Sequence, residues 1–165
     1  MKKIGLLSDT HGHWDDKFEK YFAECDEVWH AGDIGSMELA VKFEELKPFR
    51  AVYGNIDDFK TRLAYPETLN FEIENIKIIM THIGGYPGRY EPSIISMLKA
   101  NKPKLFIAGH SHILKVMYDD KLETLHMNPG AAGLYGFHKV RTLLRFVIDN
   151  GNIRDLEVIE LGKRV

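Results

Sequence analysis

Short apolar runs recur along the chain, and a polar motif follows each of them. Each run contains two to five residues that are mostly aliphatic, aromatic or β-branched, a length and composition that favour strands. The runs occupy residues 4–7, 28–29, 51–53, 76–80 and 105–108. They predict five strands, each of which ends where chemically active side chains begin.

The segments between the first three runs have helical spacing. Apolar residues recur at that spacing in residues 15–25, behind Asp15, whose charge suits a helix N-terminus. A second helix is expected after the N-cap Ser36, and Pro48 ends it before a strand at residues 49–53. This alternation of strands and helices predicts an α/β fold.

A third helix is expected to begin at Glu91-Pro92 and to end before Asn101, because proline is tolerated in the first turn. The last third of the chain instead has the pattern of strands joined by turns. These strands are predicted at residues 115–118, 122–127, 143–148 and 153–159.

Turn residues indicate how neighbouring strands pair. Asn150-Gly151 is a strong hairpin signal, and Asp119-Asp120 is expected to close another hairpin. Residues 69–73 are expected to pair with residues 76–80 across Glu74-Asn75. Two packed sheets with helices outside them fit this number of elements.

Composition limits the class of protein. The chain has 165 residues, of which 44% are hydrophobic and 28% charged, which suits a single domain over residues 1–165. With a net charge of -2 and dispersed basic residues, no stable nucleic-acid partner is expected. No apolar run approaches the roughly 20 residues that span a bilayer. The single Cys25 and the start Met1-Lys2-Lys3, which leads directly into a strand, predict a reducing, cytoplasmic setting.

Five polar motifs follow the apolar runs. Carboxyl ends of strands are where sites form in α/β sheets, because loops converge there on rigid roots. Each motif alone is more typical of a structural feature such as a tight turn, whereas all five together indicate a two-metal site. The motifs are Asp9-x-His11, Gly32-Asp33, Gly54-Asn55, Thr81-His82 and Gly109-His110-Ser111-His112.

The donor types fit two divalent ions. Ions about 3.5–4 Å apart need a ligand that bridges them, and the Asp33 carboxylate has the two oxygens to do so. Asp9 and His11 share one side of an extended segment, so both reach one ion. The other donors are neutral side chains, with His112 turned toward the other ion from His110: Asn55, His82, His110 and His112. Because the set lacks a thiolate, we expect Mn first, with Fe, Zn, Ni, Co or Mg as alternatives.

Such a centre predicts a hydrolytic reaction. Two ions lower the pKa of a shared water toward neutrality, and the resulting hydroxide attacks phosphorus in line. The predicted catalytic residues are Asp33, Asn55, His82 and His110. Loss of Asp33 is expected to be the most damaging, because it removes a ligand from both ions at once.

These motifs are similar to the signature of the calcineurin-like metallophosphoesterase family, specifically of its small bacterial and archaeal phosphodiesterases. The resemblance covers nearly the whole chain in order and implies a four-layer αββα sandwich of two mixed β-sheets. It rests on Ser8-Asp9-Thr10-His11-Gly12, His30-Ala31-Gly32-Asp33, Gly54-Asn55, Thr81-His82-Ile83-Gly84 and Gly109-His110-Ser111-His112. It implies one ion held by Asp9, His11, Asp33 and His112, and another held by Asp33, Asn55, His82 and His110.

The chain departs from the family at Ile56, where many members carry histidine and small relatives often carry cysteine. Isoleucine can neither donate a proton nor bind an oxyanion, so hydrolysis of monoesters with poor leaving groups is not favoured. A small diester with a good leaving group is the expected substrate. Asp57 and Asp58 are expected to support the metal site, to cap a helix or to face solvent.

Further polar residues lie beside the motifs. His30 is expected to orient a metal ligand. His13, Trp14 and Arg89 are candidates for substrate contact, with a solvated side chain as the alternative for His13 and Arg89. The remaining candidates are His126 and Asn128-Pro129-Gly130, which resemble a family loop near the metals but also fit a plain turn, and His138, Lys139 and Arg141, expected on a solvated face.

Two other functions compete with the phosphodiesterase. The first is a protein-interaction scaffold like the retromer subunit that shares this fold, although that relative lacks several ligand residues that stand here. The second is a nuclease, which the absence of a basic groove disfavours. A homodimer is suggested only by resemblance to small family members.

Overall fold

The computed structural model describes residues 1–165 and contains two five-stranded β-sheets that pack face to face. The first sheet has the order β10-β9-β1-β2-β3. Its parallel part is β1–β2–β3, and β9 and β10 add antiparallel strands on the far side of β1. The strands are β10 (Asn152–Lys163), β9 (Val140–Asp149), β1 (Lys2–Leu7), β2 (Glu27–His30) and β3 (Phe49–Ala51).

The second sheet has the order β4-β5-β6-β8-β7. Strands β5, β6 and β8 are parallel, and the antiparallel strands β4 and β7 form its two edges. The bounds are β4 (Thr68–Ile73), β5 (Ile76–Thr81), β6 (Leu105–Ile107), β8 (Thr124–Pro129) and β7 (Leu114–Asp119).

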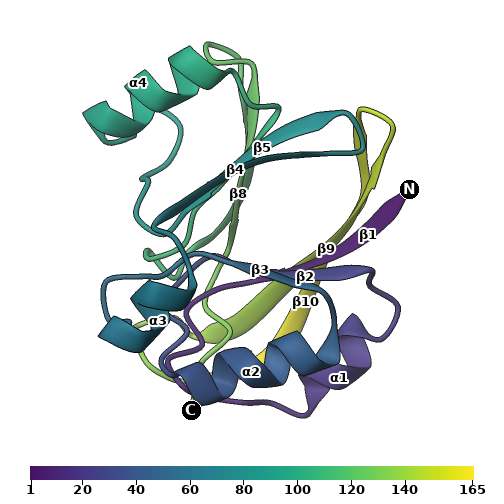
Figure 1. Ribbon diagram of the computed structural model, residues 1–165, viewed down its shortest axis with the longest axis vertical. Coiled ribbons are helices and arrows are strands. Elements are labelled where there is room, and N and C mark those ends of the chain that lie inside the picture. Colours follow the sequence, from purple (N-terminus) through teal and green to yellow (C-terminus); the bar gives the residue numbers. More distant parts are fainter.

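Helices cover the outer faces of both sheets (Figure 1). Helices α1 (Lys17–Phe22) and α2 (Met37–Leu46) lie on the first sheet, and α4 (Pro92–Asn101) lies on the second. The short α3 (Phe59–Ala64) follows β3. This arrangement confirms the predicted αββα sandwich.

The layers enclose three apolar clusters. Trp29 and Phe146 belong to the largest cluster, which lies between the two sheets. Phe18 and Phe43 pack α1 and α2 onto the first sheet, while Leu98 packs α4 onto the second. The central strands are therefore largely buried on both faces, which explains why β6 and most of β5 are apolar instead of alternating between apolar and polar residues.

The predicted turns are confirmed. Asn150 and Gly151 have φ values of 42° and 87°, and Glu74 and Asn75 have values of 49° and 61°. Positive φ at both central residues is what a two-residue hairpin with the right-handed twist of its strands requires.

Several element bounds differ from the prediction. The first helix is shorter than residues 15–25, and β3 ends at Ala51 because the Tyr53 N–H donates to Pro66 O instead of continuing the sheet. Helix α4 includes Asn101 as its last residue. The C-cap Lys102 follows and has a left-handed φ of 49°. Strand β8 begins at Thr124, because residues 120–123 form the turn.

Helix α3 was not predicted. It has only Thr61 buried, so it shows little apolar periodicity. Its N-cap is Asp58, whose carboxylate accepts hydrogen bonds from the N–H and hydroxyl of Thr61. Capping was among the expected roles of Asp58, and the structure confirms it.

Candidate metal centre

The five polar motifs converge at one edge of the sandwich. Asp9 and Asp33 follow the parallel strands β1 and β2 of the first sheet. His82, His110 and His112 follow the parallel strands β5 and β6 of the second sheet. Parallel strands end on the same side of a sheet, so the fold brings side chains from both sheets together.

Five of the predicted ligands have a left-handed backbone. Their φ values are 56° for Asp9, 46° for His11, 56° for Asp33, 70° for His110 and 61° for His112. A positive φ is uncommon outside glycine, and such strain gathers at functional sites where the surrounding structure enforces it. The fold therefore tolerates strained backbone conformations that direct these side chains toward the candidate site.

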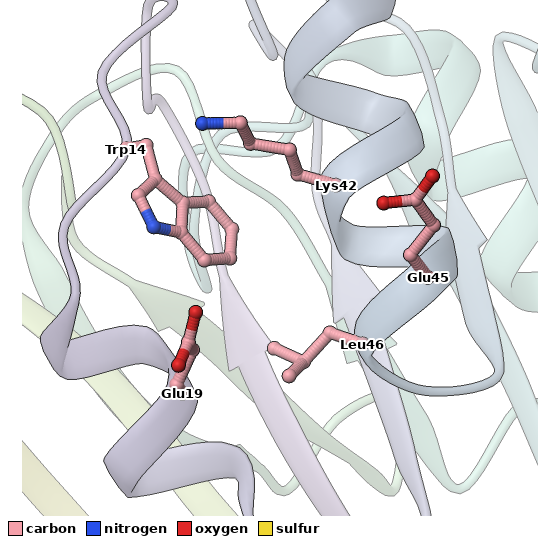
Figure 2. A pocket seen from close by; sticks show the side chains of 5 residues that line it. All are labelled: Trp14, Glu19, Lys42, Glu45 and Leu46. Atoms are coloured by element: carbon pink, nitrogen blue, oxygen red, sulfur yellow. The ribbon is translucent and has the colours of Figure 1, made fainter.

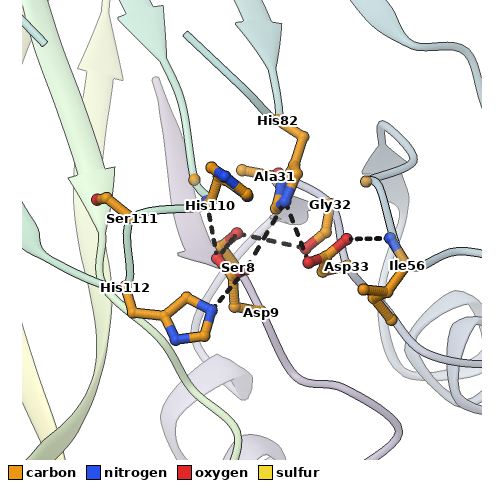
Figure 3. Close-up of polar contacts among 12 residues, drawn as sticks. Ser8, Asp9, Ala31, Gly32, Asp33, Ile56, His82, His110, Ser111 and His112 are labelled. Atoms are coloured by element: carbon orange, nitrogen blue, oxygen red, sulfur yellow. Dashed lines mark hydrogen bonds and ion pairs between the residues drawn. The ribbon is translucent and has the colours of Figure 1, made fainter. Parts of the chain in front are cut away.

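The side chains form two groups suited to metal ions. One group contains Asp9, His11 and His112; the other contains Asp33, His82 and His110; in each, the donor atoms lie within 4.8 Å of one another. Figure 3 shows the imidazoles of His82 and His112 directed toward the two carboxylates.

Asp33 lies where the two groups meet. Its Oδ2 is 3.4 Å from Nε2 of His11 and 3.2 Å from Nε2 of His82. Asp9 Oδ1 is 3.1 Å from Nε2 of His112 and 3.8 Å from Nε2 of His82. The geometry agrees with a bridging Asp33, although the ligand roles themselves stay predictions.

The unpaired ring nitrogens fit bound cations. Nε2 of His11 and of His82 are both buried without a hydrogen-bond partner. Nδ1 of His82 donates to Ala31 O at 2.7 Å, so Nε2 of the neutral ring presents a lone pair to the Asp33 carboxylate. A lone pair facing a carboxylate is unfavourable unless a cation or a proton lies between them, and second hydrogen bonds of this kind orient ligand histidines. The mixed nitrogen and oxygen donors suit transition-metal ions.

Charge interactions shift the pKa values of these groups. Burial opposes ionisation of Asp9, but the imidazoles of His11 and His112 outweigh it and hold the pKa of Asp9 well below its usual range. Burial likewise lowers the pKa of His82, yet the carboxylates of Asp33 and Asp9 bring that pKa above its ordinary value. The carboxylates are therefore ionised at neutral pH and attract positive charge.

Hydrogen bonds from the chain hold the two carboxylates in place. Oδ2 of Asp9 accepts from the Ser8 hydroxyl at 2.6 Å and from the His110 N–H at 3.1 Å. Oδ1 of Asp33 accepts from the Ile56 N–H at 3.0 Å, which leaves Oδ2 directed at the histidines. One oxygen of each carboxylate is thus used for orientation.

Asn55 and Asp57 belong to the loop after β3. Asn55 is exposed and lines a cavity together with Asp33. Asp57 is buried, and its carboxylate accepts hydrogen bonds from the N–H groups of Ile34, Gly35 and Gly54. It therefore ties the loop of Asn55 to the loop of Asp33, in agreement with its expected supporting role.

The other candidate residues lie outside the two ligand groups. His30 is buried with a pKa of about 3, which burial lowers, and it pairs with the Thr10 hydroxyl rather than with a predicted ligand. Its Nδ1 accepts from the Gly32 N–H, so it orients the backbone before Asp33. His13 and Arg89 belong to neither ligand group, and Arg89 is exposed.

Trp14 lines a different cavity. It lies between α1 and α2 with Lys42, whose Nζ is 5.4 Å from the centre of the indole ring (Figure 2). The ring packs edge-on against Phe18 and also contacts Phe43. Substrate contact by Trp14 is therefore not supported by this placement.

The residues at the end of β8 were only partly predicted, because the sequence favoured a loop or a turn at residues 128–130, whereas Asn128 and Pro129 belong to the strand. His126 is buried beside the Tyr90 hydroxyl, and the Asn128 amide donates to Gly109 O and to Ser111 Oγ. Asn128 thus supports the loop that carries His110 and His112.

The expectation of a solvated face at residues 138–141 is wrong for two of its three members. Arg141 is buried, donates to Ala132 O and pairs with Asp15 at 2.9 Å. His138 lines the cavity beside His112, whereas Lys139 is exposed as expected. The pairing partners are far away in sequence, so local polarity could not reveal this burial.

A cavity of about 560 Å³ opens beside both ligand groups. His11, Asp33, His110 and His112 form part of its wall. Tyr135 and Phe137 also line it, and the sequence analysis did not single them out. Two aromatic residues on either side of a glycine, Tyr135-Gly136-Phe137, were the signal that the sequence offered.

The family model described as the calcineurin-like phosphoesterase superfamily domain matches residues 1–151. The chain therefore belongs to this family of phosphoesterases. None of its four helices is long and apolar enough to cross a membrane.

Individual relatives agree with this assignment. The chain is 27% identical over 144 residues to the phosphodiesterase MJ0936 of Methanocaldococcus jannaschii, an alignment that covers 78% of this chain and 82% of that protein. A solved archaeal phosphodiesterase is 25% identical with a TM-score of 0.73, over 95% of this chain and 99% of that one.

The fold is also similar to that of Vps29 proteins. Vps29 of Chaetomium thermophilum has a TM-score of 0.76 at 14% identity, over 99% of this chain and 100% of that one. Vps29 of Entamoeba histolytica, solved in complex with Zn²⁺, has a TM-score of 0.70 at 17% identity, over 96% of this chain and 98% of that one. At this identity the likeness concerns the fold alone.

Proposed function

We propose that this protein is a divalent-metal-dependent phosphodiesterase that hydrolyses small phosphodiesters. The observation that carries the proposal is the pair of Asp and His groups that meet at Asp33 Oδ2. Membership of a phosphoesterase family supports the hydrolysis of phosphate esters. Similarity to the phosphodiesterase MJ0936 supports diesters as the substrate class.

In this proposal each group holds one ion. Asp9, His11 and His112 hold the first; Asp33, His82 and His110 hold the second with Asn55, and Asp33 is shared by both. When bound, the ions supply an activated water and positive charge for the phosphoryl oxygens. The chain itself orients the ligands through Ser8, the His110 N–H and the Ile56 N–H.

The cavity beside the site favours diesters over demanding monoesters. Ile56 lines this cavity where a proton donor would assist a poor leaving group, and isoleucine has no proton to give. A diester whose leaving group departs without protonation does not need such a donor. We therefore propose small diesters as the substrate. The mixed donor set makes Mn the first ion to test, and we propose a reducing cytoplasm as the setting of the reaction.

Hydrolysis of two chromogenic esters by metal-stripped protein tests the proposal. Bis-p-nitrophenyl phosphate and p-nitrophenyl phosphate are compared with added Mn, Ni, Co, Zn and Mg. We expect metal-dependent cleavage of the diester and its loss in Asp33→Asn, because that substitution weakens a ligand of both ions. The matched control Asp120→Asn changes an exposed aspartate outside both groups and should retain activity.

The competing function is a protein-interaction scaffold with the same fold. Metal content alone does not discriminate, because a Vps29 structure also contains Zn²⁺. Tight binding of ions without hydrolysis of either ester would contradict the enzyme and favour the scaffold. Activity that is equal in Asp33→Asn and the parent would contradict the assignment of the site.

A further inference from the structure

An apolar rim, formed by Ile56, Ile113, Tyr135 and Phe137, borders the cavity beside the candidate metal centre. Phe137 is fully exposed, and Tyr135 is 70% and Ile113 62% exposed. Single exposed apolar side chains are ordinary, but several that line one cavity with polar neighbours mark a binding surface. The rim needs an explanation that the metal ligands do not provide.

The two aromatic residues of the rim lie beside candidate metal ligands. They flank Gly136, where a Cβ atom would lie 2.2 Å from Nδ1 of His112. The Tyr135 ring is tilted by 30° against the His11 ring, with 5.0 Å between their centres. A group bound at the candidate metal centre would therefore lie next to the Tyr135 ring, and Phe137 follows two residues further along the same loop.

Hydrogen bonds fix the ends of the loop that carries Tyr135 and Phe137. The Gly133 N–H donates to Asp9 O at 3.1 Å, and Nε2 of His138 donates to Gly133 O at 2.9 Å. Nε of Arg164 donates to His138 O at 2.9 Å. Residues 134–137 thus form a short tip between anchored ends, and the exposure of Tyr135 is not explained by a loose segment.

The charges around the cavity select what fits there. Its twelve lining residues include no lysine or arginine, so no permanently positive side chain is present there for a second phosphate or a nucleic-acid backbone. Exposed aromatic rings instead favour flat, uncharged partners, because stacking removes two apolar faces from water. The cavity complements a substrate with one phosphate and one planar ring.

We propose that Tyr135 and Phe137 determine substrate specificity by stacking on an uncharged planar ring that is carried by a group esterified to the phosphate. The inference rests on the proposed function, since the metal centre anchors the phosphate. The ring class includes nucleobases and simple aryl groups. Ile56 and Ile113 complete the apolar rim beside the two rings.

Binding of two non-hydrolysable phosphonates to the Mn-loaded protein tests this proposal. Calorimetry compares phenylphosphonate with methylphosphonate, which share the anchoring group but differ in the ring. We expect phenylphosphonate to bind about tenfold more tightly, the order expected for burying one ring. Phe137→Ala and Tyr135→Ala should each reduce this ratio to about twofold or less, while Tyr135→Phe should retain it.

Matched controls and a second pair of probes sharpen the test. Tyr118→Ala removes an exposed aromatic ring on β7 outside the cavity and should keep the ratio of the parent. Thymidine 5′-phosphate compared with deoxyribose 5-phosphate distinguishes the ring sources. Dependence of this second ratio on Phe137 assigns a nucleobase, and dependence of the phenyl ratio alone assigns a smaller aryl group.

The outcomes separate this inference from the proposed function. A phenyl-to-methyl ratio that is the same in the parent, Tyr135→Ala and Phe137→Ala overturns the role of the rim, whatever the activity. A ratio that depends on the rim in a protein that cleaves no diester overturns the proposed function and leaves the aromatic site standing. Failure of both phosphonates to bind overturns the role of the rim, and the proposed function falls with it only where the diester is not cleaved either.

Discussion

At the scale of the residue, the two oxygens of the Asp33 carboxylate have different surroundings. The Ile56 N–H binds Oδ1, and the histidines of both groups face Oδ2. The backbone of residue 56 thus supports the site, while its side chain faces the cavity. These two functions of one residue can be separated by substitution.

Ile56→His is expected to raise hydrolysis of a monoester with a poor leaving group, such as ethyl phosphate, by at least about tenfold. A positioned proton donor typically contributes 10²–10⁴-fold, and the backbone hydrogen bond to Asp33 does not depend on the side chain. Phosphate release by the Mn-loaded variant is the measurement. Ile56→Gln adds polarity without a proton donor, and an equal gain there would contradict this leaving-group argument.

Sequence reasoning identified the side chains of the centre but not all of their support. Six of the seven predicted ligands lie in the two groups, because each directly follows an apolar strand that places it at the sheet edge. Asn55 borders the same cavity. The hydrogen bonds of Asp57 to Ile34 and Gly35 could not be read from sequence, because they join loops about 22 residues apart.

At the scale of the element, the long apolar strands were predictable and the exposed elements were not. Strand β5 is largely buried on both faces, and its sequence is apolar from Ile76 to Met80 except for Lys77. Helix α3 has a single buried residue and leaves no such pattern. The rim loop takes its shape from contacts with Asp9 and Arg164, which only the tertiary fold supplies.

The segment before α1 is joined to β9 by a partly buried ion pair. Arg141 donates to Asp15 at 2.9 Å, and the Lys17 N–H donates to the other oxygen of Asp15. Burial raises the pKa of Asp15, but the hydrogen bonds from the Lys17 N–H and Arg141 outweigh it, so the pKa lies below its ordinary value. The ionised carboxylate is therefore favoured in the folded state.

Asp15→Asn is expected to lower the free energy of unfolding by about 2 kcal/mol at pH 7, since it leaves buried Arg141 without its counter-charge. A carboxyl whose pKa is lower in the folded state stabilises the fold at pH values above its unfolded-state pKa of about 3.9. This stabilisation is lost as the pH falls through the folded-state pKa. The difference between parent and variant should therefore shrink below about pH 4. Urea unfolding across pH measures it.

The exposed pair of Arg154 and Asp155 provides the control for this prediction. Asp155→Asn removes a solvent-screened partner and should change the unfolding free energy little at any pH. A pH-independent loss in Asp15→Asn would contradict the electrostatic explanation and indicate a packing defect instead.

At the scale of the whole molecule, the candidate centre connects the two sheets. Asp9 and Asp33 follow strands of the first sheet, whereas His82 and His112 follow strands of the second. Ions bound by both sets would hold the layers together at this edge. Binding that is specific to the folded state stabilises it by mass action.

Metal removal is therefore expected to lower the Tm. Saturation at a hundred times the Kd contributes about 2.7 kcal/mol, which corresponds to a Tm increase of about 5–10 °C for a chain of this size. Differential scanning fluorimetry with chelator, and then with added Mn, measures the shift. Asp33→Asn should lose most of it. Ions that bind at two per chain without moving the Tm would contradict a centre that spans both sheets.

The pairing of β1 affects how the chain matures during synthesis. Lys2 pairs with Ile148 and Leu6 with Leu144, so this first strand lies in the interior of its sheet beside one of the last strands. While a ribosome is still translating the middle of the chain, β1 lacks that neighbour and exposes an unpaired apolar edge. Completion of the sheet, and of the loops that aim Asp9, must wait until β9 has emerged. The nascent chain therefore needs protection of its first strand, by rapid completion of synthesis or by a chaperone, until its last strands have emerged.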